Sequence, residues 1–246
     1  MNERRKLINW MAGVTTFIVV LLIVIVLLDR EEDGVSLAAA SRTVALTLES
    51  GDGILENAPE TSNFDEDLSD QWYVKYMDYL YGQGYLDSGS VKADERSATS
   101  AVTYAVLSDW ATDALLSYVD SGDRAKKAVS SENFWKFYDA FRAAVDPDRA
   151  VAEVETDLYG TPDNVDGAPA WTAYTRDGIF QFEGLYLDGY IDQKIRFLAR
   201  DDEILKVEEM VSDEIVYENA WISGFSGKTV TVFIGNIQRE FPVKGV

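Results

Sequence analysis

The chain has 246 residues and a formal net charge of −21 at pH 7, with 43 acidic against 22 basic side chains. It contains neither cysteine nor histidine, which excludes disulfide bonds, thiolate catalysis, structural zinc sites and imidazole acid–base chemistry. Clustered lysine and arginine are needed to displace counterions from a nucleic acid, so the acidic excess also excludes a nucleic-acid partner. With 47% hydrophobic residues, the chain can bury cores over a length that suits two small domains.

Residues 7–28 form an uncharged, predominantly apolar stretch. A helix of this length would extend about 33 Å, against roughly 30 Å of bilayer hydrocarbon. The sequence therefore predicts a transmembrane helix over these residues. A cleaved signal peptide, with Ala38–Ala40 supplying small residues, and a buried core helix are the alternatives.

The flanking charges predict the orientation of this span. Arg4–Lys6 precede it, whereas the linker of residues 29–35 is mainly acidic, so the positive-inside rule places residues 1–6 in the cytoplasm. The rest of the chain is then expected outside the cell membrane. An extracytoplasmic protein without cysteine is more typical of a bacterium than of a eukaryotic secretory pathway. Gly13 has no glycine partner at a four-residue spacing, so the span shows no helix-dimerisation motif.

Four segments with helical periodicity predict a helical domain over residues 36–146. An acidic loop with small polar residues and Pro59 separates the first two, and Asp146–Pro147 ends the last. The predicted helices cover residues 36–49, 71–86, 97–119 and 132–145.

The remaining residues, 147–246, predict an antiparallel β domain. Their apolar residues alternate with a period of two, and β-branched and aromatic residues dominate. We expect five to seven short strands in a small sheet or barrel-like module, with Gly235–Asn236 as a hairpin turn. Within residues 194–200, alternation places Ile195 in the core and Leu198 on the solvated face. The predicted fold class is thus α+β: a transmembrane helix, a small helical module and a small antiparallel β module.

Part of the helical domain resembles an S-layer-homology (SLH) repeat. Trp72, Tyr73, Tyr76, Leu80 and Gly84 match the first half of that repeat, and Glu95–Ala98 stand where it has a Thr-Arg-Ala-Glu-like tetrapeptide. The resemblance covers residues 69–111, and residues 36–49 look like a relic of a preceding repeat. It implies a fold of small helices, and it implies binding of cell-wall polymers.

Residues 158–241 are similar to the region upstream of the catalytic part in membrane-anchored SpoIID/LytB-like peptidoglycan-cleaving proteins of sporulating Firmicutes. The stretches that carry this similarity are 158–165, 168–178, 182–192 and 211–222. The Tyr-Leu-x-Gly-Val-Val-x-x-Glu-Met segment of the catalytic part does not occur in the sequence. The similarity therefore assigns no catalytic glutamate to this chain.

Candidate catalytic and metal sites have simpler explanations. Neighbouring carboxylates at residues 201–203 and 208–209 could suggest glycoside hydrolysis, but such neighbours are expected in so acidic a chain, and adjacent strand residues face opposite ways. The acidic turns at residues 146–148 and 163–166 lack the twelve-residue loop of a calcium site, so turn chemistry explains them better. We expect no catalytic residue, metal site or cofactor.

Trp72, Tyr73 and Arg96 are the candidate glycan-binding residues. Aromatic rings can stack on sugars, although the helical spacing of the aromatic residues also suits a core. The sequence predicts a membrane-anchored, non-catalytic envelope protein that binds or positions cell-wall polymer or an envelope partner. The alternative is the anchoring part of a peptidoglycan-cleaving lytic transglycosylase of the SpoIID/LytB-like type that continues beyond Val246. A ligand sensor has no support, since the cytoplasmic tail is too short for a signalling domain.

Overall fold

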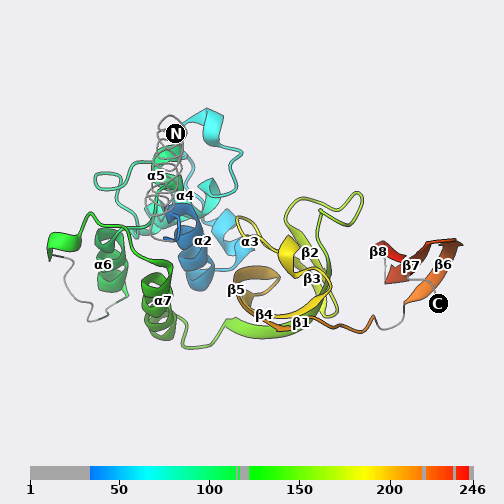
Figure 1. Ribbon diagram of the computed structural model, residues 1–246. Helices are drawn as coiled ribbons and strands as arrows, with labels where there is room; N and C mark the ends of the chain where they lie inside the picture. The colour runs from blue at the N-terminus through cyan, green and yellow to red at the C-terminus, as the bar shows by residue number, and fades with distance from the viewer. Residues whose placement is uncertain (1–33, 115, 117–121, 218–219, 235–236, 244–246) are drawn as a thin grey trace, which may run out of the picture.

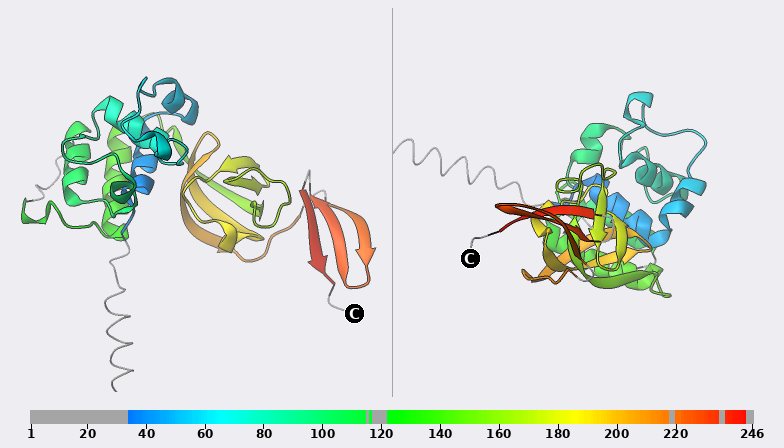
Figure 2. Two further views of the ribbon diagram at one scale, coloured as in Figure 1. Left: turned by 90° about the horizontal axis from the view of Figure 1, so that it is seen from above. Right: turned by 90° about the vertical axis from the view of Figure 1, so that its right-hand side faces the viewer.

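The computed structural model describes residues 34–114, 116, 122–217, 220–234 and 237–243. They form an α+β structure with three parts that follow one another along the chain and in space. These are a helical part, a five-stranded barrel and a three-stranded C-terminal sheet (Figures 1 and 2).

The predicted fold class has to be corrected. The β-rich residues form two separate sheets rather than one antiparallel module. Among the described residues, no helix has both the length and the apolar character needed to cross a bilayer. The predicted transmembrane helix of residues 7–28 and the cytoplasmic tail of residues 1–6 lie outside the described part of the chain.

Helix α2 (Leu37–Leu48) is the centre of the helical part, and α4 and α7 pack against it (Figure 1). The side chain of Ser36 caps its first turn by accepting a hydrogen bond from the Ala39 N–H at 3.2 Å. Its alanine-rich sequence lets neighbouring elements approach from all sides, so almost the whole helix is buried. The helix ends where Glu49 adopts an extended conformation and Ser50 caps the next helix.

The other helices complete the helical part. They are α3 (Gly51–Glu56), α4 (Val74–Gln83), α5 (Glu95–Thr99), α6 (Tyr104–Asp113) and α7 (Ser131–Val145), with the short 3-10 helices η1 (Glu66–Leu68) and η2 (Gly122–Arg124). Of these, α3 and α5 also contact α2. The single helix predicted over residues 97–119 is wrong, because the chain is extended between α5 and α6. There the Val102 N–H donates to the Val35 carbonyl and the Val129 N–H donates to the Val102 carbonyl, each at 2.9 Å.

The barrel closes in the strand order β1-β2-β3-β5-β4, which is that of a five-stranded Greek-key barrel of the OB type. Its strands are β1 (Val151–Gly160), β2 (Thr172–Thr175), β3 (Gly178–Gln181), β4 (Gln193–Arg200) and β5 (Glu203–Ser212), with η3 (Asp188–Tyr190) before β4. A single parallel bridge, Gln181 to Glu203, joins β3 to β5, and the other pairs are antiparallel. Phe180, Ile195 and Phe197 fill the interior.

One prediction for the barrel strands is wrong. Leu198, expected on the solvated face of β4, is buried. It joins Val151 and Leu205 in the core of the helical part, because the helices cover this end of the barrel. The outer face of the barrel is therefore part of an interface between the two modules.

A charged cluster holds that interface together; we call it the joint. The guanidinium of Arg42, on α2, donates to the Ile204 carbonyl at 2.6 Å and to the Glu203 carboxylate at 2.8 Å. In the opposite direction, Arg200 of β4 donates to the Thr47 carbonyl of α2 at 2.9 Å. These contacts fix the helical part on the barrel.

The C-terminal sheet comprises β6 (Trp221–Ser226), β7 (Thr229–Ile234) and β8 (Ile237–Pro242), in that order. Ile234 and Ile237 pack against Tyr159 and Val165 of the barrel. The Arg239 guanidinium also forms two hydrogen bonds with the Asp192 carboxylate, at 2.9 and 3.0 Å. The sheet is thus attached to the barrel by a small apolar cluster and one ion pair.

Candidate functional site

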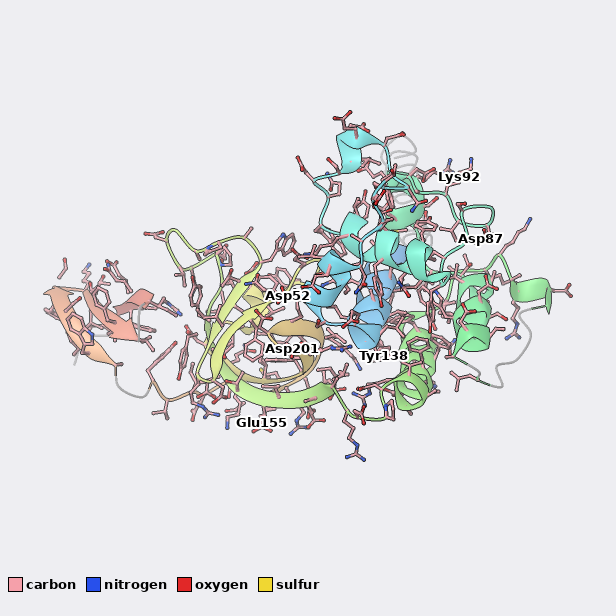
Figure 3. The ribbon with its side chains drawn as sticks, turned by 180° about the vertical axis from the view of Figure 1, so that it is seen from behind. Asp52, Asp87, Lys92, Tyr138, Glu155 and Asp201 are labelled. Carbon is pink, nitrogen blue, oxygen red and sulfur yellow. The ribbon has the colours of Figure 1, made fainter. Side chains whose placement is uncertain are left out.

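A pocket of about 390 Å³ lies in the helical part, between α5, α6, the start of α2 and the loop before α5; we call it the α5–α6 pocket. Leu37, Val91, Val102, Ala105 and Val106 give it an apolar wall. Lys92 and Arg96 are its two cationic side chains, and Asp109 is its acidic one. Lys92 lies at the end of the helical part that is remote from the barrel (Figure 3).

Backbone hydrogen bonds fix the wall of this pocket. Asp94 caps α5 by accepting a hydrogen bond from the Ser97 N–H at 2.7 Å, which sets the position of Arg96 in the first turn. The end of α5 is tied to α2 because the Leu37 N–H donates to the Ser100 carbonyl at 2.7 Å. The pocket is therefore a preformed feature of the fold.

The two cations of the pocket are not engaged in ion pairs. Within the described part of the chain, neither Lys92 nor Arg96 has a carboxylate oxygen within 4.0 Å; Asp94 acts on both only at longer range. Most basic residues of the barrel, by contrast, are paired, as Arg196 is with Glu155 at 2.9 Å. Two free cations beside an apolar wall can bind an anionic group whose remainder is less polar.

Asp109 offsets this positive charge only while its carboxyl group is ionised. Partial burial raises the pKa of its carboxyl group, and the nearby Asp113 and Asp87 raise it further. The carboxyl group therefore takes up a proton more readily than an isolated aspartate. The pocket becomes more positive as the pH falls towards this raised pKa.

A second, smaller cationic pocket of about 240 Å³ adjoins the first across the chain at Thr103–Ala105. Arg124 and Lys127 line it, together with Tyr104 and Asn133, whose side-chain amide donates to the Tyr104 hydroxyl at 3.2 Å. Each of the two pockets thus has two cationic side chains in its lining, on a chain of net charge −21.

The structure does not bring the three predicted glycan-binding residues together. Arg96 is exposed at the α5–α6 pocket. Tyr73 is only 3% exposed and packs edge-on against Phe64, so it belongs to the core. Trp72 lies against Gly184, where an added Cβ would be 2.6 Å from Cζ2 of the indole. Tyr73 is therefore part of the core and the half-buried Trp72 packs on the barrel side, whereas Lys92, which the sequence argument did not single out, lies beside Arg96 at the pocket.

The carboxylates noted in the sequence have structural partners. Glu203 binds Arg42 in the joint, and Glu209 binds Arg196 on the barrel surface. Glu183, absent from the predicted candidates, accepts a hydrogen bond from the Tyr76 hydroxyl at 2.8 Å and pairs with Lys75 at 2.8 Å. No sequence signal marks Arg42 or Glu183, because each interacts with a residue more than a hundred positions away.

The acidic turns also serve the backbone. The Asp146 carboxylate accepts hydrogen bonds from the Ala150 and Val151 N–H groups, at 2.7 and 3.0 Å. Asn164 accepts one from the Thr161 N–H at 2.8 Å. Among the described residues, no group of three or more acidic side chains is arranged to hold a metal ion.

Comparison of the chain with protein-family models, with curated proteins and with solved structures finds no match.

Proposed function

We propose that this protein is a non-catalytic binding and positioning module of the bacterial cell envelope, and that its α5–α6 pocket holds an anionic group of a cell-wall polymer. The observation that supports this most directly is the pair of free cations, Lys92 and Arg96, on the apolar wall of a preformed pocket. A chain with nearly twice as many acidic as basic residues would repel a polyanion almost everywhere else.

The same proposal places the protein at the cell membrane. The apolar sequence of residues 7–28 favours attachment there, with residues 1–6 in the cytoplasm and the described parts outside. Because the buried Arg42–Glu203 ion pair and the hydrogen bond from Arg200 to the Thr47 carbonyl join the helical part to the barrel, a polymer bound at the pocket would be held at a fixed distance from the barrel. The same two cations could also bind an exposed acidic or phosphorylated segment of another envelope protein.

Co-sedimentation with peptidoglycan sacculi tests the proposal. We expect the purified protein to sediment with sacculi that keep their secondary polymers and to stay in solution when these polymers have been removed. The variant Lys92→Ala/Arg96→Ala should lose most of this binding, because a charge-assisted contact contributes about 1.5–3 kcal/mol and two are removed.

Lys228→Ala is the matched control, because Lys228 is an exposed lysine on the C-terminal sheet that forms no ion pair with another described residue. Its binding should equal that of the unmodified protein. Absence of sedimentation with both sacculus preparations, or an equal loss in the Lys228→Ala control, would show that the pocket does not bind wall polymer.

A further inference from the structure

The two edges of the C-terminal sheet differ in composition. The edge strand β8 carries Arg239, Glu240 and Pro242, and charged residues and proline discourage pairing with another strand. The opposite edge strand, β6, contains no charged residue and no proline between Trp221 and Ser226. Figures 1 and 2 show β8 on the barrel side of the sheet and β6 on the far side. The edge strand without charged residues or proline is thus the one that points away from the rest of the molecule.

Large apolar side chains are exposed along this edge on both faces of the sheet. Ile222 is 69% exposed and Phe225 is 66% exposed. They pair with Val232 and Val230 and so extend the apolar face that packs on the barrel. On the opposite face, Trp221 is 56% exposed and stacks on Phe233, with ring centroids 4.7 Å apart.

This arrangement restricts what can cover β6. A helix or a flat surface would cover one face of the sheet and leave the aromatic residue on the other face in water. A strand added at the edge places alternate side chains on both faces and also satisfies the free backbone groups. The occupant that fits is therefore an extended chain.

We propose that the occupant is β6 of a second copy of this chain, paired antiparallel across a two-fold axis. In this register Ile222 lies opposite Phe225 of the second copy, on the same face, so the two most exposed large apolar side chains of the strand cover each other. Ser223 and Gly224 flank the axis, where their small size permits close approach. The product is a continuous six-stranded sheet.

Charge and size set the strength of this contact. Each copy brings a net charge of −21, but β6 itself is uncharged, so no like charges meet at the contact. One six-residue strand per copy gives a small interface, of the class below about 1,200 Å² that is typical of transient association. The β-bulge between Ile222 and Gly224 also limits the number of hydrogen bonds. The dimer is therefore weak, and salt strengthens it by screening the repulsion between the two acidic chains.

Sedimentation velocity of the full chain tests the proposal. It would be measured from about 5 to 200 µM protein, at 50 and 500 mM salt, in a mild detergent that keeps the apolar residues 7–28 dispersed. We expect the weight-average sedimentation coefficient to rise with protein concentration, and to rise more steeply at the higher salt. Ile222→Lys/Phe225→Lys should weaken this association at least tenfold, because four like charges would face one another in the dimer.

Leu55→Lys is the matched control, since Leu55 is 57% exposed on α3, far from the C-terminal sheet. It should associate like the unmodified chain. A protein that remains monomeric under all these conditions overturns the proposal. Self-association that the double substitution leaves unchanged, or that Leu55→Lys weakens equally, overturns it as well. Lys92 and Arg96 lie in a different part of the molecule. The outcome of this experiment therefore does not affect the test of wall-polymer binding.

Discussion

Replacing Arg42 by methionine should destabilise the protein strongly and in a pH-dependent manner. The Arg42 side chain is 2% exposed and its partner Glu203 is 12% exposed. The substitution keeps most of the side-chain volume but removes two hydrogen bonds of a charged group, each worth about 1.5–3 kcal/mol. It also leaves a largely buried carboxylate without its cation, and breaking such a pair costs about 3–5 kcal/mol. We therefore expect the free energy of unfolding to fall by about 3–5 kcal/mol at pH 7.5.

The pH dependence follows from the Glu203 carboxyl group. Burial raises its pKa in the folded state, although Arg42 acts in the opposite direction. A raised folded-state pKa means that the protonated form stabilises the fold, and that this contribution is lost as the pH rises through the folded pKa. Without Arg42 the pKa rises further, so the destabilisation by Arg42→Met should be smaller at pH 4.5 than at pH 7.5.

Urea unfolding followed by circular dichroism at the two pH values measures both effects. Arg196→Met serves as the control, because Arg196 forms its ion pairs with Glu153, Glu155 and Glu209 on the exposed face of the barrel, where such pairs stabilise less than buried ones. An Arg42→Met variant that is as stable as this control at pH 7.5, or that loses as much stability at pH 4.5, would refute the assigned role of the joint.

Three further outcomes are expected. Gly184→Ala should destabilise the protein by about 1–3 kcal/mol in urea unfolding, because φ is +71° and the new methyl group would meet Trp72; Gly82→Ala, with open space around it, should not. Tyr138→Phe should cost about 1 kcal/mol by the same assay, since it removes the buried 2.9 Å hydrogen bond to Thr47. Binding of wall polymer should strengthen as the pH is lowered towards the raised pKa of Asp109 and its carboxyl group takes up a proton, and an Asp109→Asn variant should lose this pH dependence.

Local patterns were sufficient to predict several elements. The helices α2, α4 and α7 lie within or close to the predicted segments, since each combines a capping or turn signal with an apolar face. The inward alternation of Ile195 and Phe197 in β4 was also readable, because the side-chain period of a strand is fixed.

The remaining features depend on partners that are distant in sequence. The break between α5 and α6 exists because residues 101–103 bridge to Ser36 and Ala128, which overrides local helical preference. Leu198 is buried by helices that precede it by fifty residues or more. The division of the strands into a closed barrel and a separate sheet likewise depends on which strands pair with each other. The period-two pattern of a strand does not indicate its pairing partner.

The candidate site shows the same division. Of the three residues named from the sequence, Trp72, Tyr73 and Arg96, only Arg96 lines the α5–α6 pocket. The sequence pattern of an aromatic residue at helical spacing is the same whether its side chain faces a ligand or the core. Lys92 lies at the pocket because the fold brings the loop before α5 next to α6, and no local sequence motif indicates that contact.

The central claim, that Lys92 and Arg96 bind an anionic wall polymer, is tested most directly by the salt dependence of that binding. The dissociation constant of the protein for solubilised secondary polymer would be measured between 50 and 500 mM salt, for the unmodified chain and for Lys92→Ala/Arg96→Ala. We predict that binding weakens as salt increases, and that the double variant binds at least tenfold more weakly with a shallower salt dependence. Binding that is equally tight in the variant, or insensitive to salt, would contradict the account.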